Sequence, residues 1–172
     1  MSTLKVNDIQ TTGGAPNLGR VINVIQTIDS SATTVSGAAG FYSYGGLDTT
    51  VTPLRSSSKF LLMYNIRIGC YQYSRRAILY IDGSVYNSRA TDNYRASTGS
   101  MFVPNTSNIS DASIWEHTGE YVYSHSGSGS FNVSFQVHKQ DGNALYVNRA
   151  SNYDDTDRGR PTSTLTIMEI SQ

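Results

Sequence analysis

The side chains best suited to recognition lie between positions 71 and 95, where tyrosines interleave with arginines. A tyrosine offers a flat apolar face with a polar hydroxyl, and an arginine offers a planar fork that binds carboxylates or sugar acids. This mixture favours binding of a saccharide or a protein, although tyrosines also pack in strands and arginines also keep a surface soluble. The set comprises Tyr71, Tyr73, Tyr80, Tyr86, Tyr94, Arg75, Arg76, Arg89 and Arg95.

A ligand contact is expected in the second half of this set. The segment from Arg75 to Ser88 predicts a strand and a turn, and the stretch after it is irregular. Loops carry variable recognition on a fixed scaffold, so a contact fits there best. The predicted receptor-binding residues are Tyr86, Arg89, Tyr94 and Arg95.

The residue types that perform catalysis are scattered. His117, His125 and His138 lack the spacing of metal ligands, and no paired cysteines, nucleophile elbow or phosphate-binding loop occurs. The single cysteine, Cys70, is read as a small buried hydrophobe rather than a catalytic thiol. A binding or structural protein with no cofactor and no metal is therefore expected, rather than an enzyme.

Two acidic patterns leave alternatives open. Residues 152–160 hold Asp154, Asp155 and Asp157 beside two arginines. The spacing resembles the start of a calcium loop but lacks the closing bidentate acid, so a solvated loop with Asp–Arg pairing is favoured. A glycosidase pair could be drawn from Glu116 and Glu120 with those aspartates, but nothing in the spacing selects two of them.

Composition excludes several classes of protein. Charged residues make up 15% of the 172, with 13 Lys plus Arg against 13 Asp plus Glu, and Ser and Thr fill about a quarter of the chain. Zero net charge disfavours nucleic-acid binding through a basic surface and disfavours an acidic disordered tail. The longest apolar runs have about five residues, far short of the roughly 20 that cross a bilayer.

Apolar residues recur with a period of two along most of the chain. In Ser130–Lys139 and in Lys59–Gly69, every second residue is apolar, which is typical of strands with one buried face. About eight to ten short strands without helical periodicity indicate an antiparallel sandwich or barrel. Further strands are predicted at 19–28, 47–54, 75–81, 85–87, 120–124, 144–148 and 163–170.

Turn residues separate these predicted strands. Asp82-Gly83 predicts one hairpin, and Asp141-Gly142-Asn143 predicts another between the strand at Phe131 and the next one. The Gly/Ser run from Ser124 to Ser130 could be a linker between domains, but it is better explained as a hairpin loop within one domain. One domain over residues 19–172 is therefore expected.

The two ends of the chain carry apolar residues of their own. The last strand is apolar on both faces toward its end, which predicts an interface with another copy through Leu165, Ile167, Met168 and Ile170. Residues 1–18 contain Leu4, Val6 and Ile9 before a Gly-Gly-x-Pro break. They are expected to form an arm, and the alternative is a first strand of the sandwich.

Several segments resemble the small tail-fibre-like virion proteins of marine bacteriophages, and of cyanophages in particular. They are the opening MSTLKVNDIQTTGG, TPL at 52–54 followed by SSSKFLL at 56–62, YVNR at 146–149, TDRG at 156–159 and STLTIMEI at 163–170. The resemblance spans the chain and is most specific at the termini. It implies a jelly-roll-like β-sandwich that assembles as a homotrimer, with its N-terminal segment toward the particle.

The resemblance also implies a role and a place. A short tail fibre or fibre-like appendage on the virion would attach the particle to a host surface polysaccharide or protein. Its partners would be its own copies and another virion protein that holds the arm, with no nucleic acid and no membrane insertion. The alternative is a capsid or tail decoration protein that serves assembly alone. A polysaccharide depolymerase is disfavoured, because no acid pair is evident.

Overall fold

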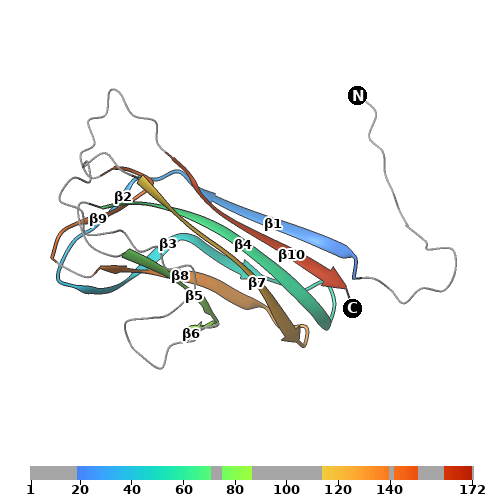
Figure 1. Cartoon of the computed structure of the whole chain (residues 1–172). Helices are drawn as coiled ribbons and strands as arrows, with labels where there is room; N and C mark the ends of the chain where they lie inside the picture. Colours follow the sequence, from blue (N-terminus) through green and yellow to red (C-terminus); the bar gives the residue numbers. More distant parts are fainter. Residues whose placement is uncertain (1–18, 71–74, 87–113, 140–141, 151–160, 172) are drawn as a thin grey trace, which may run out of the picture.

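Ten β-strands form the regular structure of the described residues, which are 19–70, 75–86, 114–139, 142–150 and 161–171 of a computed structural model (Figure 1). No helix long and apolar enough to cross a membrane occurs in those residues. The strands are β1 (Val21–Asp29), β2 (Thr33–Val35), β3 (Gly40–Val51), β4 (Ser57–Cys70), β5 (Arg75–Ile81), β6 (Ser84–Val85), β7 (Ile114–Ser126), β8 (Phe131–Lys139), β9 (Leu145–Val147) and β10 (Ser163–Ser171).

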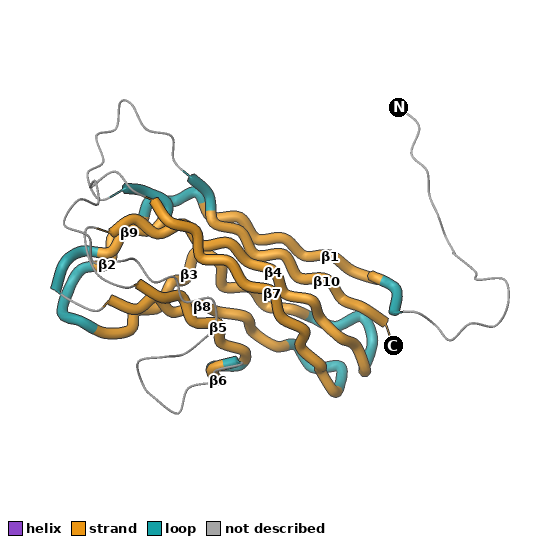
Figure 2. Tube along the Cα trace, in the orientation of Figure 1, coloured by secondary structure: helices purple, strands orange, loops and turns teal. Residues whose placement is uncertain are grey.

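The strands form two antiparallel sheets that face each other (Figure 2). In the larger sheet β4 is central, because β7 pairs with one of its edges while β10 and then β9 pair with the other. β1 pairs with β10 and β2 pairs with β9. The short strands β9 and β2 therefore lie in line with the long strands β10 and β1. The smaller sheet has the order β3-β8-β5-β6.

The order of the longer strands is that of a jelly roll. Without the short β2 and β9, the larger sheet reads β1-β10-β4-β7 and faces β3-β8-β5-β6. Consecutive strands then lie in opposite sheets, apart from β5 and β6, as in a jelly roll wound from two Greek keys. The predicted all-β, antiparallel, jelly-roll-like sandwich of eight to ten strands is confirmed.

The core is built by the alternation that the sequence shows in β4 and β8. Every second side chain of β4 from Phe60 to Ile68 is buried, and so is every second one of β8 from Phe131 to Val137. Both sets belong to one hydrophobic cluster between the sheets. Because successive side chains of a strand point to opposite faces, the remaining residues of these strands lie on the outer surfaces.

Of the three turns predicted from sequence, one is a hairpin and two are not. Asp82 and Gly83 have φ values of 50° and 74° and join β5 to its neighbour β6, as predicted. The hairpin prediction for residues 124–130 is wrong, because β7 and β8 lie in different sheets. The hairpin prediction for Asp141-Gly142-Asn143 is wrong for the same reason, since β8 and β9 also lie in different sheets.

The sequence-predicted interface of the last strand is divided between the two faces of β10. Leu165 and Ile167 are 0% and 1% exposed and belong to the chain's own core, which corrects their prediction as interface residues. Met168 and Ile170 lie on the outer face and are partly exposed. The arm residues Leu4, Val6 and Ile9 lie outside the described residues.

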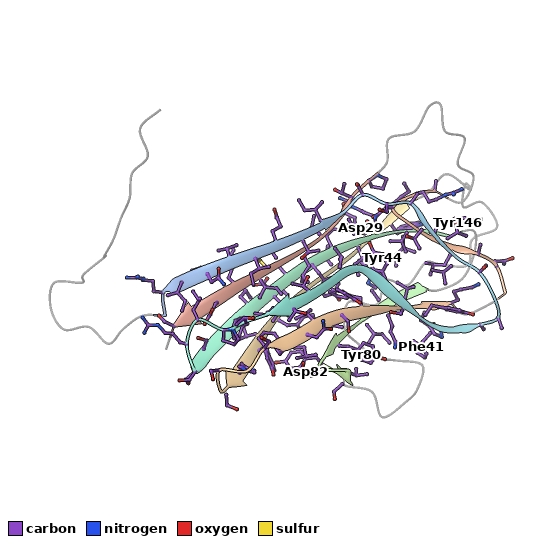
Figure 3. All side chains as sticks on the ribbon, turned by 180° about the vertical axis from the view of Figure 1, so that it is seen from behind. Asp29, Phe41, Tyr44, Tyr80, Asp82 and Tyr146 are labelled. Atoms are coloured by element: carbon purple, nitrogen blue, oxygen red, sulfur yellow. The ribbon has the colours of Figure 1, made fainter. Side chains whose placement is uncertain are left out.

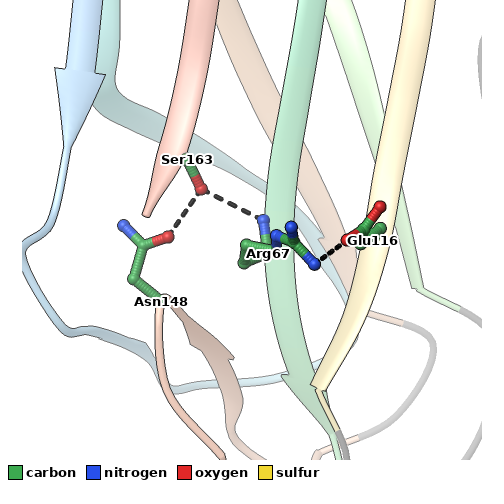
Figure 4. A network of polar contacts seen from close by, with 4 residues as sticks. All are labelled: Arg67, Glu116, Asn148 and Ser163. Atoms are coloured by element: carbon green, nitrogen blue, oxygen red, sulfur yellow. Dashed lines mark hydrogen bonds and ion pairs between the residues drawn. The ribbon is translucent and has the colours of Figure 1, made fainter. Parts of the chain in front are cut away.

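A buried polar network lies in the larger sheet where the long strands β1 and β10 give way to the short strands β2 and β9. The Asn148 side-chain amide donates to the Asp29 backbone oxygen at 2.9 Å and to its carboxylate at 3.1 Å. Ser163 donates to the Asn148 side-chain oxygen at 2.6 Å and accepts from the Arg67 backbone N–H at 3.0 Å (Figure 4). Arg67 in turn forms an ion pair with Glu116 (Figure 4).

The same aspartate also ties the larger sheet to the smaller one. The Tyr44 hydroxyl donates to the Asp29 carboxylate at 2.5 Å, and Figure 3 shows these two labelled side chains near each other between the sheets. The Ser31 N–H donates to the other carboxylate oxygen at 2.8 Å. Asn148 is fully buried with φ of 58°, a left-handed conformation that asparagine tolerates better than most residues.

Two substitutions of Asn148 separate the contribution of its side-chain hydrogen bonds from that of its left-handed backbone. Asn148→Gly keeps the left-handed backbone accessible but leaves buried groups of Asp29 and Ser163 unpaired, so we expect a loss of about 1–3 kcal/mol in the free energy of unfolding. Asn148→Ala adds backbone strain of about 1–2 kcal/mol. Denaturant unfolding measures both, with the outer-face variant Asn132→Ala as control. Equal stability of the three variants would contradict this role.

Candidate ligand-binding edge

Aromatic side chains gather where β7, an edge strand of the larger sheet, meets the β5–β6 hairpin of the smaller sheet. Among the described residues β7 pairs only with β4. We call the residues Tyr86, Tyr121, Tyr123 and His125 the aromatic edge. All four are partly exposed, so they offer surface as well as packing.

Strand register brings these side chains to one place. Tyr121 and Tyr123 pair with Leu62 and Phe60 of β4, both of which face the core. Directly paired residues project on the same face of a sheet. The inward side chains of β7 therefore lie at the open side of the sandwich, and Tyr86 reaches them from the smaller sheet.

Tyr86 stands edge-on between the two tyrosines of β7. Its ring centroid lies 5.4 Å from that of Tyr123 and 6.4 Å from that of Tyr121, with interplanar angles of 89° and 88°. Its hydroxyl donates to the Val122 backbone oxygen at 2.7 Å. Edge-to-face pairs of this kind contribute about 0.5–1.5 kcal/mol each. Tyr86 thus holds the two sheets together at this edge and still presents part of its ring to solvent.

A glycine makes room for the tyrosine beneath the aromatic edge. A Cβ on Gly119 would lie 2.5 Å from the nearest ring carbon of Tyr64 and 2.7 Å from its hydroxyl oxygen. Tyr64 is 4% exposed, stacks on Tyr121 with centroids 6.2 Å apart and contacts Phe135. Its hydroxyl has no hydrogen-bond partner among the described residues. A buried donor therefore lies directly under the exposed rings.

Polar groups border the rings on the side of the smaller sheet. One oxygen of the Asp82 carboxylate accepts from the Asn132 backbone N–H at 2.8 Å. Asp82 is exposed at the turn, so its carboxylate can accept further hydrogen bonds from a ligand. Burial raises the pKa of Tyr123, and the Asp82 charge adds to this increase. Tyr80, labelled near Asp82 in Figure 3, lies on the outer face of the smaller sheet, where it donates to Gln136. Flat rings can stack on a ligand, and a nearby carboxylate can accept hydrogen bonds from the hydroxyl groups of that ligand.

The structure places few of the predicted recognition residues. Tyr86 lies in the aromatic edge, while Arg89, Tyr94 and Arg95 fall outside the described residues, as do Tyr71 and Tyr73. Tyr121 and Tyr123 were missed by the sequence analysis, which placed a strand at 120–124 but assigned it no site. The alternation of Tyr121 and Tyr123 along that strand was the available signal.

The other catalytic or metal-binding candidates from the sequence take part in packing or in an ion pair where the structure describes them. His117 is buried, His138 packs against Phe41, and Glu116 pairs with Arg67. The segment with Asp154, Asp155 and Asp157 lies outside the described residues. In the part of the chain that the structure describes, no three His, Cys, Asp or Glu side chains are grouped so as to hold a metal ion.

Gly119→Ala tests the fit under the aromatic edge. The added methyl would overlap the Tyr64 ring, which neighbouring rings hold in place, so we expect a loss of about 1–3 kcal/mol in the free energy of unfolding. Gly129→Ala is the matched control, because a Cβ there meets no atom within 4 Å. Denaturant unfolding compares the two variants, and equal stability would contradict the packing described.

Alkaline pH should destabilise the protein through its buried tyrosines. Burial raises the pKa of Tyr44 and of Tyr64, and at Tyr44 the hydrogen bond to Asp29 adds to the increase. A raised pKa in the folded state means that stability is complete below the unfolded value of about 10 and is lost as pH rises through the folded value.

We therefore expect tyrosinate absorbance to rise in two steps, the later of which accompanies unfolding, because Tyr44 and Tyr64 ionise only when their hydroxyls leave the interior. Tyr64→Phe should reduce the loss of stability between neutral and alkaline pH. A single step near pH 10 that leaves the fold intact would contradict the burial of these hydroxyls.

Comparison with known proteins adds little to this description. No protein-family model and no curated protein matches the chain. Among solved structures, the chain is similar to one described as "EclA C-terminal domain; sugar-binding protein", with a TM-score of 0.39 and 11% identity over 90% of this chain and 89% of that chain. Similarity at this level carries no argument about function, so the candidate site rests on the residues of this chain alone.

Proposed function

We propose that this protein is a bacteriophage virion protein of the tail-fibre type, which attaches the particle to the surface of its host without acting as an enzyme. In this proposal residues 1–18 dock the protein to another virion protein, and the jelly roll presents the recognition surface. The aromatic edge is the observation that carries the proposal. The resemblance of the terminal segments to tail-fibre-like proteins supports the assignment to a virion.

The chemistry of the aromatic edge fits a host-surface saccharide. One face of a sugar ring carries mainly C–H groups, which pack against the electron-rich face of a tyrosine. The sugar hydroxyls need acceptors at the rim, and the Asp82 carboxylate is near enough to Tyr123 for its charge to raise the pKa of that tyrosine. Binding sites of this kind place a few polar groups around aromatic walls.

The low net charge is consistent with this mode of recognition. With 13 acidic and 13 basic side chains the formal net charge is +0, so no strong long-range field draws a ligand in. Contacts between individual side chains must then supply the affinity. Arg89, Tyr94 and Arg95 remain predicted contributors to this surface.

Tyrosine truncation at the aromatic edge tests the proposal. In phage carrying Tyr121→Ala or Tyr123→Ala we expect adsorption to host cells to fall by tenfold or more, because truncating a central aromatic contact costs about 2 kcal/mol or more. The measurement is the adsorption rate of purified particles.

Tyr146→Ala is the matched control. Tyr146 is a partly exposed tyrosine of β9, where Arg149 covers its ring at 4.8 Å from the centroid. Each variant protein must also keep its native unfolding transition and its place on the particle. Normal adsorption by correctly assembled Tyr121→Ala and Tyr123→Ala particles would overturn the proposal.

A decoration protein that serves assembly is a second candidate function. The apolar outer face of the larger sheet favours it, because Val24 and Val122 there are 55% and 56% exposed. The same particles separate the two functions. If the protein serves assembly alone, the tyrosine variants should adsorb normally. Particles made without the protein should then be physically less stable.

A further inference from the structure

An apolar row crosses the outer face of the larger sheet from one edge to the other. Val24 of β1 pairs with Met168 of β10, Met168 pairs with Leu61 of β4, and Leu61 pairs with Val122 of β7. Directly paired residues project on the same face, so these four side chains form one line across four strands. We call Val24, Met168, Leu61 and Val122 the apolar row.

Exposed hydrophobic side chains are concentrated on this face. Of the seven large hydrophobic residues that are exposed in the described part of the chain, Val21, Val24, Ile28 and Val122 lie on β1 and β7 of the larger sheet. Ile170 and Met63, beside the row, are partly exposed. Contiguous apolar surface of this kind marks interaction sites in soluble proteins.

Charged residues flank the apolar row in a pattern that suits a second copy. Lys59 lies on β4 on one side of the row, two residues before Leu61. Glu120 lies on the neighbouring strand β7 on the other side, two residues before Val122. Both side chains are exposed.

We propose that a second copy of this chain packs face to face on this surface, related by a two-fold axis that runs along the apolar row. This pair replaces the homotrimer that the resemblance implies. This rotation places each row over its own copy and reverses the strand direction. It therefore brings the side of the row that holds Lys59 over the side that holds Glu120 in the partner. Seen along the sheet, Lys59 on β4 is then displaced from the partner's Glu120 on β7 by one strand spacing, about 5 Å. The two-fold axis repeats this contact, so the interface contains two such pairs.

The alternative two-fold axis, parallel to the strands, does not produce this match. It would exchange β1 with β7 and place Glu120 opposite Gln26, which occupies the corresponding position on β1. The chosen axis thus joins apolar burial with charge complementarity. Met168 and Ile170, predicted from sequence to lie in an interface, take part in this surface, whereas Leu165 and Ile167 do not.

The mass of the full-length protein over a range of concentrations tests the proposal. We expect a species of two chains, each of 18.8 kDa, that dissociates on dilution, and a trimer would overturn the proposal. Val24→Glu or Val122→Glu should raise the dissociation constant at least tenfold, because each buries a charge in the contact. Leu54→Glu, at a loop residue that is 63% exposed, is the control.

A charge exchange tests the two-fold arrangement itself. Lys59→Glu and Glu120→Lys should each weaken association, and the double variant should restore it, while the unfolding transition of every variant stays native. A monomer at all concentrations would overturn the proposal. So would an oligomer that Val24→Glu and Val122→Glu leave intact, or a double variant that associates no better than the single ones.

Discussion

The larger sheet depends on one buried amide, that of Asn148. In two places of this sheet a long strand ends and a short one lies in line with it, β1 followed by β2 and β10 followed by β9. Asn148 satisfies groups on both sides of the break, through Asp29 at the end of β1 and Ser163 at the start of β10. Unpaired polar groups in the interior cost more than the bonds themselves contribute, so this position constrains both sheets. Tyr44 extends the constraint to the smaller sheet.

The alternation of apolar residues was sufficient to predict the fold class and the buried faces of β4 and β8. It could not show which strands are neighbours. A Gly-rich segment has the same composition whether it closes a hairpin or connects strands in opposite sheets. The Asp82-Gly83 turn requires positive φ at both positions and was predicted correctly. In the segment after Ser126, positive φ occurs at Gly127 alone, so the paired requirement of a two-residue hairpin turn is missing. The pairing of β1 with β10, almost the whole chain apart, leaves no local signal either.

The candidate site was only partly accessible from sequence for the same reason. Tyr86 belongs to a run of tyrosines and arginines and so was noticed, whereas Tyr121 and Tyr123 were treated as members of a strand. Their role depends on β7 being an edge strand, which only the order of strands in the sheet decides. The alternation of Leu165 and Ile167 with Met168 predicted two apolar faces correctly, but only the structure shows that the first two side chains lie in the core.

The position of β10 between β1 and β4 governs when the protein can fold. Val21 pairs with Ile170 and Ile170 pairs with Lys59, so the first strand has no partner in its sheet until the last one has been made. A nascent chain therefore carries apolar strands with unpaired edges until β10 leaves the ribosome. Folds dominated by such distant pairings fold slowly, in milliseconds to seconds. Synthesis thus leaves an interval in which the chain is vulnerable to aggregation or to capture by a chaperone, and shortening it at the C-terminus would make that state permanent.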